Sequence, residues 1–264
     1  MRKILVLGGG RMGSALLGGL FRSGWATWEE CTVVEVRGET RELLADRFPG
    51  LRVVEVPEPA GAVVLAVKPQ DVEAACRSLP VRGYERVLSI VAGATIAHLE
   101  SWLWPGAAVI RAMPNTPALV GMSASAIAGG TATTEEDVSW AESVLSSIGV
   151  VVRLPERLLD SATGLSGSGP AYVFLVAEAL VEAGVLQGLD REVSKVLANQ
   201  TILGAARMLA ESGESAEVLR AAVTSPGGTT AAGLRELEAR AVRAAFLEAV
   251  DAAARRSREL GEPD

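Results

Sequence analysis

The sequence predicts an α/β protein, with a doubly wound sheet domain over residues 1–153 and an all-α dimerisation domain over residues 154–264. Three observations support this prediction. Short apolar runs alternate with helical patterns in the first half of the chain, a glycine-rich turn follows the first run, and strand patterns cease after residue 153. Continuous apolar strands separated by helices indicate a parallel sheet that is covered on both faces.

The first half of the chain contains a series of strand-like runs with helical patterns between them. Strands are expected at residues 3–7, 32–36, 52–54, 62–67, 87–91, 107–111, 123–128 and 150–153. Helices are expected at residues 12–23, 39–47 and 134–147. The last of these is capped by Thr133 or Thr134 and has three acidic residues in its first turn, which favours a helix start there.

The second half shows helical periodicity throughout. Helices are expected at residues 170–187, 190–212, 215–222, 229–240 and 242–260, with Gly184, Gly188 and Gly213 as interruptions. These helices are rich in alanine and glycine, so they can pack closely but have little apolar bulk to bury as an isolated half-domain. We therefore expect a dimerisation domain, and a compact monomeric helical cap is the alternative.

The composition limits the partners of the protein. Its 264 residues are 49% hydrophobic, which allows a sizeable core, and they carry a net charge of −7 with a pI near 5.0. Basic residues form no block, so we expect no nucleic-acid partner. The first apolar run, residues 4–7, is too short for a signal peptide, and no run of about 18 apolar residues occurs. We therefore expect a cytoplasmic protein with no membrane partner.

Few side chains are available for acid–base, covalent or metal chemistry. The chain has a single histidine, His98, and three lysines. His98 has no acid or nucleophile beside it and is expected to be structural or exposed. Cys31 and Cys76 lack partners at metal-ligand or redox spacing, so we expect buried thiols and no metal site. Mechanisms based on a histidine triad or a Schiff-base lysine are disfavoured.

Residues 8–13 fit the pattern G-x-G-x-x-G directly after a strand and at the start of a helix. In a Rossmann-like domain the first glycine makes the tight turn, the second lets a pyrophosphate approach, and the third lets the helix pack on the strand. We therefore expect a dinucleotide site here rather than a purely structural turn. Its residues are Gly8, Gly9, Gly10, Arg11, Met12 and Gly13.

The end of the second strand bears on the choice of cofactor. An acid at this position usually holds the ribose hydroxyls of NAD, but here Val36 precedes Arg37 at the expected strand end. Arg37, with Arg41 nearby, can meet a 2′-phosphate, which favours NADP(H) over NAD(H); the alternative is a solvated arginine. Glu35 could take the position of the acid only if the strand ended earlier than expected.

Two further loops leave strands at the edge where doubly wound sheets bind ligands. The loop at residues 66–69 contains Lys68, which is placed to reach a cofactor ribose or the nicotinamide region unless it is only a surface lysine. The loop at residues 111–117 contains two prolines, which stiffen it, and presents Asn115.

Residues 223–230, which we call the helix-start segment, have the sequence Val-Thr-Ser-Pro-Gly-Gly-Thr-Thr. Pro226 fixes its own φ, and the glycines let backbone N–H groups approach a ligand closely. The N–H donors and the positive dipole end of the following helix suit a carboxylate. The alternative is an ordinary N-cap with surplus hydroxyl groups.

Over essentially its whole length the chain resembles pyrroline-5-carboxylate reductase, the last enzyme of proline biosynthesis. The resemblance rests on GGGRMG at residues 8–13, AVKPQ at 66–70, RAMPNTP at 111–117, Glu156 with TGLSGSGPAY at 163–172, and VTSPGGTT at 223–230. It implies reduction of (S)-1-pyrroline-5-carboxylate to L-proline by NADPH, or by NADH, in an intertwined homodimer that forms the active site. A larger ring of dimers is also compatible with it.

The resemblance also assigns roles by position. Thr230 resembles the threonine that hydrogen-bonds the ring nitrogen, and Glu156 lies in a motif that borders the site. Gly213 stands about where some relatives carry an acid, which puts any role for an acid there in doubt. The implied substrate-binding residues are Ser225, Gly227, Gly228, Thr229, Thr230 and Glu156. The implied cofactor-binding residues, besides the glycine turn and Arg37, are Ala66, Val67, Lys68, Pro69, Ala92, Gly93 and Asn115.

The scarcity of histidine and lysine fits the reduction of an imine. A cyclic imine can be protonated before or during binding, so the enzyme has chiefly to align the hydride donor with the imine carbon. A related imine or β-hydroxyacid reductase is an alternative, but the latter uses a lysine shortly after a glycine-rich helix start, whereas after residues 166–169 the next lysine is Lys195. A non-enzymatic NADP(H)-sensing module is the other alternative.

Overall fold

The chain divides by packing into two units in the computed structural model, which describes residues 2–80 and 83–261. The sheet unit comprises Met1–Ser168 with Asp251–Asp264, and the helical unit comprises Gly169–Val250. The division expected at residue 153 follows the end of the strands. Packing instead groups residues 154–168 and the last turns of the final helix with the sheet.

The sheet unit contains an eight-stranded sheet with the order β3-β2-β1-β4-β5-β6-β7-β8. All the expected strands form. Their bounds are β1 Arg2–Leu7, β2 Cys31–Val34, β3 Arg52–Val54, β4 Ala60–Leu65, β5 Arg86–Ser89, β6 Ala108–Met113, β7 Ser123–Gly129 and β8 Gly149–Arg153. Chain order reverses direction across the sheet at β1 and β4, which is the kind of switch point where such sheets bind ligands.

The expectation of a parallel sheet is wrong at one pair. β6 and β7 run antiparallel, whereas the other neighbouring strands of the described sheet pair in parallel. A parallel pair needs a crossover of about a dozen residues or more, usually a helix. The link between β6 and β7 contains only the 3-10 helix Thr116–Val120, so the chain turns back on itself.

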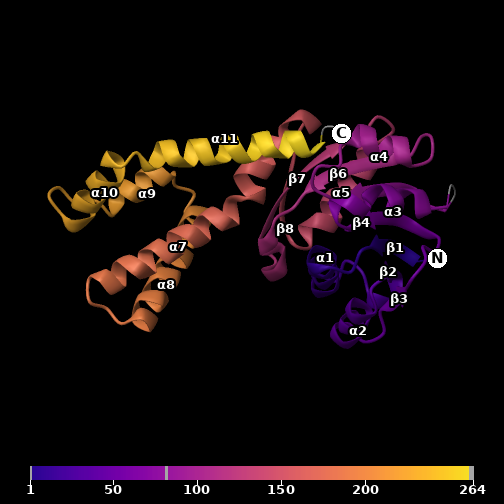
Figure 1. The fold of residues 1–264 in the computed structure, drawn as a ribbon, viewed down its shortest axis with the longest axis horizontal. Helices are drawn as coiled ribbons and strands as arrows, with labels where there is room; N and C mark the ends of the chain where they lie inside the picture. The colour runs from indigo at the N-terminus through magenta and orange to yellow at the C-terminus, as the bar shows by residue number, and fades with distance from the viewer. Residues whose placement is uncertain (1, 81–82, 262–264) are drawn as a thin grey trace. The chain divides into compact units, whose positions relative to one another are not determined.

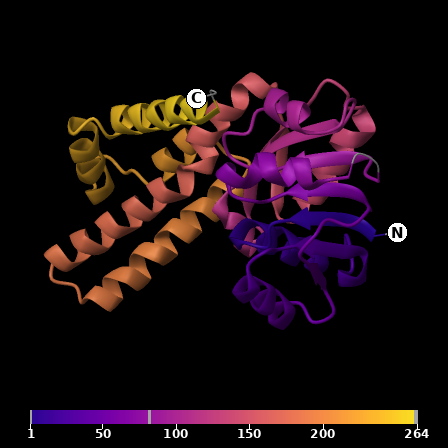
Figure 2. The same ribbon diagram turned by 45° about the vertical axis from the view of Figure 1, so that its right-hand side comes forward.

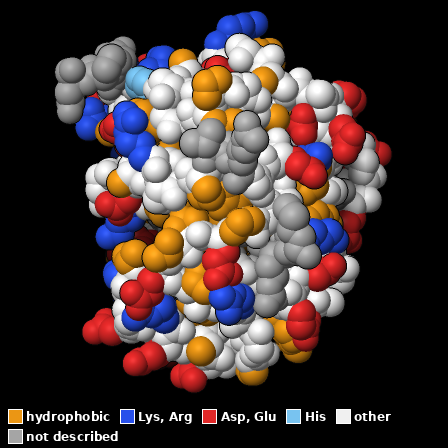
Figure 3. All heavy atoms as spheres, turned by 90° about the vertical axis from the view of Figure 1, so that its right-hand side faces the viewer, with side chains coloured by type: hydrophobic (Ala, Val, Ile, Leu, Met, Phe, Trp, Pro, Cys, Tyr) orange, Lys and Arg blue, Asp and Glu red, His pale blue; other side chains and the backbone are white. Residues whose placement is uncertain are grey.

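Helices cover both faces of the sheet (Figure 1). They are α1 Arg11–Arg22, α2 Gly38–Arg47, α3 Val72–Ser78, α4 Ile96–Trp102, α5 Glu135–Ser146 and α6 Leu159–Ala162. One apolar core joins Ile4 and Val6 of β1 to Leu16 and Leu20 of α1, and a second core lies on the other face of β1. Thr134, rather than Thr133, caps α5, because its side chain accepts from the N–H of Asp137. On the side of this unit where the N-terminus lies, basic and acidic side chains are interspersed with apolar ones (Figure 3).

Both cysteines belong to these cores, and we expect them to be inert in the native protein. Cys31 is 0% and Cys76 2% exposed, and burial raises the pKa of Cys76 to about 11. A thiol reagent at about pH 8 should therefore modify neither residue until the protein is unfolded in denaturant. Rapid labelling of the native protein at Cys76, detected by peptide mass spectrometry, would contradict this burial.

The helical unit is built from the five helices expected from the sequence. They are α7 Gly169–Leu186, α8 Arg191–Glu211, α9 Ala216–Ala222, α10 Thr229–Ala239 and α11 Val242–Gly261, whose end continues into the sheet unit. α7 and α8 run side by side as a hairpin (Figures 1 and 2). At their crossing a Cβ on Gly184 would lie 2.6 Å from Ser194 Oγ, so Gly184 permits the close approach rather than ending the helix.

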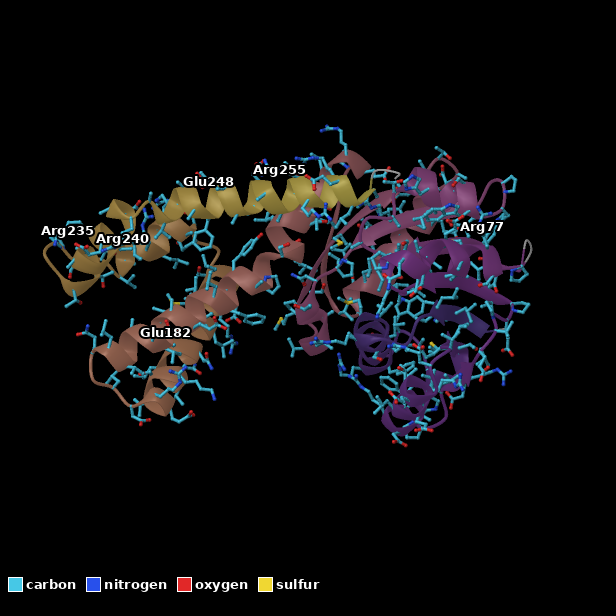
Figure 4. The ribbon with its side chains drawn as sticks, viewed as in Figure 1. Arg77, Glu182, Arg235, Arg240, Glu248 and Arg255 are labelled. Atoms are coloured by element: carbon cyan, nitrogen blue, oxygen red, sulfur yellow. The ribbon has the colours of Figure 1, made fainter. Side chains whose placement is uncertain are left out.

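The helices of this unit bury little within one chain. Among the described residues of α7, α9 and α10 none is buried. Phe174 and Leu175 of α7 are 62% and 66% exposed. Charged side chains also project from these helices, among them Glu182 on α7 and Glu248 on α11 (Figure 4). Such a large exposed apolar area is unusual for a monomer and marks an interaction surface.

The segment Glu156–Leu186 has a mean hydropathy of 1.5 over its most apolar window and could cross a membrane by length and composition only. The sequence lacks an uninterrupted apolar run there because serines and glutamates interrupt it. The dimerisation surface expected from the sequence accounts for the same apolar residues.

Candidate active site

The predicted cofactor residues lie at one edge of the sheet. β1, β4, β5 and β6 are parallel, so the loops that follow them emerge together at their carboxyl ends. These loops contain residues 8–13, 66–69, 92–93 and 115. The fold therefore brings together at this edge the stretches that the sequence analysis selected separately.

The glycine turn has the geometry that a dinucleotide requires. Gly8 has φ +102°, and a Cβ there would lie 2.6 Å from the carbonyl oxygen of Ala66. A Cβ on Gly13 would meet the carbonyl oxygen of Gly8. In contrast, nothing lies within 4 Å of a Cβ built on Gly10. The first and third glycines thus serve close packing, whereas the second leaves open space before the N-terminus of α1, where a pyrophosphate fits.

A pocket of about 800 Å³ opens beside this turn. Gly10 and Arg11 line it on one side, and Arg37 and α2 line it on the other. Its size suits the adenosine half of a dinucleotide, and its arginines suit phosphate. Its lining residues are Gly9, Gly10, Arg11, Ser14, Arg37, Thr40, Leu43, Leu44, Asp46, Arg47 and Leu119.

The second strand ends earlier than expected, and this changes the position of Glu35. β2 ends at Val34 and not at residue 36, so Glu35 is the first residue after the strand. Its carboxylate is buried and accepts hydrogen bonds from the N–H of Gly9 at 3.1 Å and the N–H of Arg37 at 3.0 Å. Because the strand ends earlier than expected, Glu35 stands at the position where an acid usually holds the ribose hydroxyls.

The two arginines near Glu35 differ in how they are held. The side chain of Arg37 is 58% exposed, and its Nε lies 3.4 Å from Glu35 Oε1. Arg41 donates from Nη1 to the carbonyl of Val36 at 3.0 Å and pairs through Nη2 with Glu55 at 2.9 Å. Arg37 lines the pocket, whereas the guanidinium of Arg41 is engaged by the carbonyl of Val36 and by Glu55.

The other predicted cofactor residues occupy different environments. Lys68 is exposed and precedes the 3-10 helix Pro69–Asp71. Asn115 is buried, and its side chain donates to the carbonyl of Ser166 at 2.9 Å and accepts from the N–H of Ala124 at 3.0 Å. The side chain of Asn115 thus fixes the surrounding loops. Gly93, with φ +78°, lies against the end of α11, where a Cβ would be 3.1 Å from the carbonyl oxygen of Leu260.

Glu156 belongs to a partly buried ionic network around the buried Arg111. Glu156 Oε1 accepts from the N–H of Ile96 at 2.7 Å and from Arg111 Nη1 at 3.1 Å. Arg111 Nη2 lies 3.4 Å from Asp160 Oδ1, which also accepts from Ser257 Oγ at 2.7 Å. The network fastens the start of α4, the region of α6 and the end of α11 to β6. RAMPNTP and Glu156 are separate motifs in the sequence, and they come into contact only in the folded protein.

The helix-start segment lies in the helical unit and has the form expected of it. α10 begins at Thr229, and Gly228 is its N-cap residue. Among the residues that the structure describes at this helix start, no side chain caps α10 by a hydrogen bond. Gly227 has φ +71°, and Ser225, Thr229 and Thr230 are exposed. The N-cap residue is a glycine, so the hydroxyl groups of Ser225, Thr229 and Thr230 lie around the helix start without capping it.

Some pocket residues had no signal in the sequence. Thr40, Asp46 and Arg47 line the pocket from one face of α2, a helix whose apolar pattern is weak. Ser14 donates from Oγ to the carbonyl of Gly9 at 2.8 Å and so supports the turn. Glu35 was considered from the sequence only on the condition that the second strand ended earlier than residue 36, which it does.

Comparison with known proteins agrees with these features. Residues 156–260 match the family model for pyrroline-5-carboxylate reductase dimerisation, and residues 3–93 match the model for NADP oxidoreductase, coenzyme F420-dependent. The pyrroline-5-carboxylate reductase of Mycobacterium tuberculosis is 43% identical over 287 aligned positions, which cover 98% of this chain and 97% of that protein.

Solved structures show the same relationship. A pyrroline-5-carboxylate reductase from Coxiella burnetii superposes with a TM-score of 0.91 at 33% identity and covers 99% of both chains. The Plasmodium falciparum pyrroline carboxylate reductase, solved with NADP bound, has a TM-score of 0.83 at 29% identity over 99% of this chain and 98% of that one. On these grounds, the chain belongs to the pyrroline-5-carboxylate reductase family of NAD(P)-dependent oxidoreductases.

Proposed function

We propose that the helix-start segment binds the carboxylate of (S)-1-pyrroline-5-carboxylate, and that the pocket beside the glycine turn binds NADPH in preference to NADH. The observation that carries the substrate assignment is the start of α10, where hydroxyl groups and N–H donors gather without a side-chain cap. A helix N-terminus offers N–H donors and a partial positive charge, which together favour a carboxylate.

Thr230 has a distinct role in this proposal. With the ring nitrogen protonated, its N–H donates to Thr230 Oγ1 and so fixes the orientation of the ring. The hydroxyl of Ser225 and the N–H groups at the start of α10 hold the carboxylate, which is attached to the ring carbon next to that nitrogen. The nicotinamide cofactor, when bound, supplies the hydride that adds to the imine carbon. The chain contributes chiefly alignment, which is worth a large part of the barrier in well-oriented reactions.

This proposal also explains why a general acid is not needed. Hydride addition to the iminium carbon gives the secondary amine of L-proline directly, because the nitrogen already carries its proton. The residues that bind the iminium do not have to deliver that proton. The chain's single histidine, His98, stacks on Trp102 at 5.5 Å between ring centroids and is thus held in a structural contact.

The preference for NADPH rests on Arg37, and we expect Arg37→Ala to reduce it. Loss of a charged contact to the 2′-phosphate should lower kcat/KM with NADPH roughly tenfold or more and leave kcat/KM with NADH within about twofold. Steady-state kinetics with both cofactors measures this. Arg41→Ala is the control, because Arg41 is engaged by Glu55 and should change the ratio little. An unchanged ratio in Arg37→Ala would show that Arg37 does not bind the 2′-phosphate.

We propose that the working form is a homodimer or a larger assembly of dimers in the cytoplasm. The exposed apolar residues of α7 and α8 support this, because an interface of adequate size needs such a surface. The test of the function itself is direct. The purified protein should oxidise NADPH only when pyrroline-5-carboxylate is present, and chiral chromatography should identify one L-proline per NADPH consumed. Cofactor binding without turnover would point to the sensing module instead.

A further inference from the structure

Two largely buried arginines lie at opposite ends of neighbouring strands of the sheet. Arg86 is the first residue of β5, and its side chain is 13% exposed, with Nε 3.1 Å from Asp137 Oδ1. Arg111, whose side chain is 7% exposed, lies on β6 opposite Ser89, the last residue of β5. Because β5 and β6 are parallel, Arg111 but not Arg86 lies at the carboxyl edge, where the predicted cofactor loops emerge.

The loop that leaves β5, residues 90–95, is held both at its end and in its middle. At its end, the N–H of Ile96, the first residue of α4, donates to Glu156 Oε1 at 2.7 Å. In its middle, Gly93 has φ +78°, and a Cβ there would lie 3.1 Å from the carbonyl oxygen of Leu260. The backbone of the loop therefore cannot shift without breaking the first contact or closing on the second.

Arg111 fixes the carboxylate that holds the end of this loop. Its Nη1 donates to Glu156 Oε1 at 3.1 Å, and its Nη2 lies 3.4 Å from Asp160 Oδ1. Asp160 is fixed in turn by Ser257 Oγ, which donates to Oδ1 at 2.7 Å. The side chain of Glu156 is 34% exposed, so burial alone does not hold it. A planar guanidinium that bridges two carboxylates sets the orientation of both.

Stability alone does not account for a charged side chain at the place of Arg111. The desolvation cost of a buried charge can exceed the attraction of its ion pairs, and packed apolar side chains often stabilise a fold as well. What the ion pairs provide is direction, because they place the acceptor for the N–H of Ile96 at a fixed point. A loop that is already held in its binding geometry loses less entropy when a ligand binds.

The loop at residues 90–95 lies on the side of the glycine turn that faces away from the pocket. The pocket lies between the glycine turn and α2, and it suits the adenosine half of a dinucleotide. In the sheet, β2 lies on one side of β1, whereas β4 and then β5 lie on the other. A dinucleotide with its pyrophosphate at the glycine turn therefore extends its nicotinamide half toward the loop that follows β5.

We propose that Arg111 is a positioning residue, which acts through Glu156 to hold the loop at residues 90–95 in the geometry that accepts the nicotinamide half of the cofactor. This inference rests on the proposed function only in that the sheet unit binds NADPH. Arg111 contributes through the carboxylates that it bridges and does not itself contact the cofactor or the substrate. Its loss should weaken binding of the nicotinamide half and spare binding of the adenosine half.

The test compares NADPH with adenosine 2′,5′-bisphosphate as ligands of the full-length protein, by isothermal titration calorimetry. NADPH occupies both halves of the site, whereas the bisphosphate occupies only the pocket. In Arg111→Met the Kd of NADPH should rise about tenfold, and the Kd of the bisphosphate should stay within about twofold of wild type. A residue that only stabilises the sheet would move both constants alike. A ratio of the two constants within about twofold of the wild-type ratio, or one changed in the other direction, would overturn the proposal.

Arg86→Met is the matched control, because Arg86 is also largely buried and paired with an acid but lies at the amino end of β5. It should leave the ratio of the two constants within about twofold of wild type, and a change as large as that of Arg111→Met would also contradict the proposal.

A second variant covers the case in which Arg111→Met does not fold, as judged by its thermal unfolding. Arg111→Lys keeps a cation between the two carboxylates but loses the planar fork that bridges them. The ratio should then change about threefold in the same direction, and an unchanged ratio would count against the proposal. Binding of NADPH to the wild-type protein in the same titrations tests the cofactor part of the proposed function separately.

Discussion

Replacing Thr230 with alanine should lower kcat/KM for pyrroline-5-carboxylate by roughly 10- to 150-fold, the effect expected for losing a hydrogen bond to a charged group. Thr230 lies in the first turn of α10, is exposed, and takes no part in capping the helix. Its hydroxyl is therefore available to the ring nitrogen of the substrate. Steady-state kinetics at saturating NADPH measures the effect.

Thr224→Ala provides the control for this prediction. Thr224 belongs to the same segment, but its Oγ1 donates to the carbonyl of Arg220 at 2.6 Å, so its hydroxyl is engaged within the chain. This variant should stay within about threefold of wild type. A Thr230→Ala enzyme within about twofold of wild type, a difference of roughly 0.4 kcal/mol, could not owe ring orientation to Thr230.

The second large effect is expected at the apolar surface of α7. Phe174→Glu should convert the assembly to monomers at micromolar concentration and abolish most of the activity. Phe174 is 62% exposed in the single chain, in a helical unit that matches the dimerisation model. A glutamate in its place would bring an unpaired charge into the interface, which is strongly unfavourable. Light scattering coupled to size-exclusion chromatography gives the assembly state, and the NADPH assay gives the activity.

Glu182→Gln is the control on the same helix (Figure 4). Glu182 is exposed, and its neutral counterpart should leave both assembly and activity nearly unchanged. If Phe174→Glu remains a dimer and keeps its activity, the apolar face of α7 at this residue is not the surface that joins two chains.

Much of the fold could be predicted because its signals are local. Continuous apolar runs gave all eight strands, and periodicity gave the five helices of the helical unit. The reversal between β6 and β7 was missed, because apolar runs have the same appearance in either direction. The short α3 was missed as well. The strand ends were uncertain by about two residues, since the hydrogen bonding that ends a strand depends on its neighbours.

Candidate site residues can be selected from the sequence where one motif carries its own geometry, as at Gly8–Gly13 and at the start of α10, and these assignments stay predictions. Contacts between distant residues were not predicted. Glu35 is held by Gly9, which lies 26 positions earlier in the chain, and Arg111 joins Glu156 and Asp160 only because β6 ends beside the region of α6. The hydrogen bonds of the Asn115 side chain to Ser166 and Ala124 were not predicted either. Such contacts follow from tertiary packing and have no spacing rule in the sequence.

Substrate binding at the start of α10 through the carboxylate is tested most directly by comparing pyrroline-5-carboxylate with 1-pyrroline, the same cyclic imine without that group. With saturating NADPH, kcat/KM for 1-pyrroline should be lower by about a hundredfold or more, because the charge-assisted hydrogen bonds to the carboxylate are lost. Equal values of kcat/KM for the two imines would contradict it, because the helix-start segment would then contribute nothing to recognition of the carboxylate.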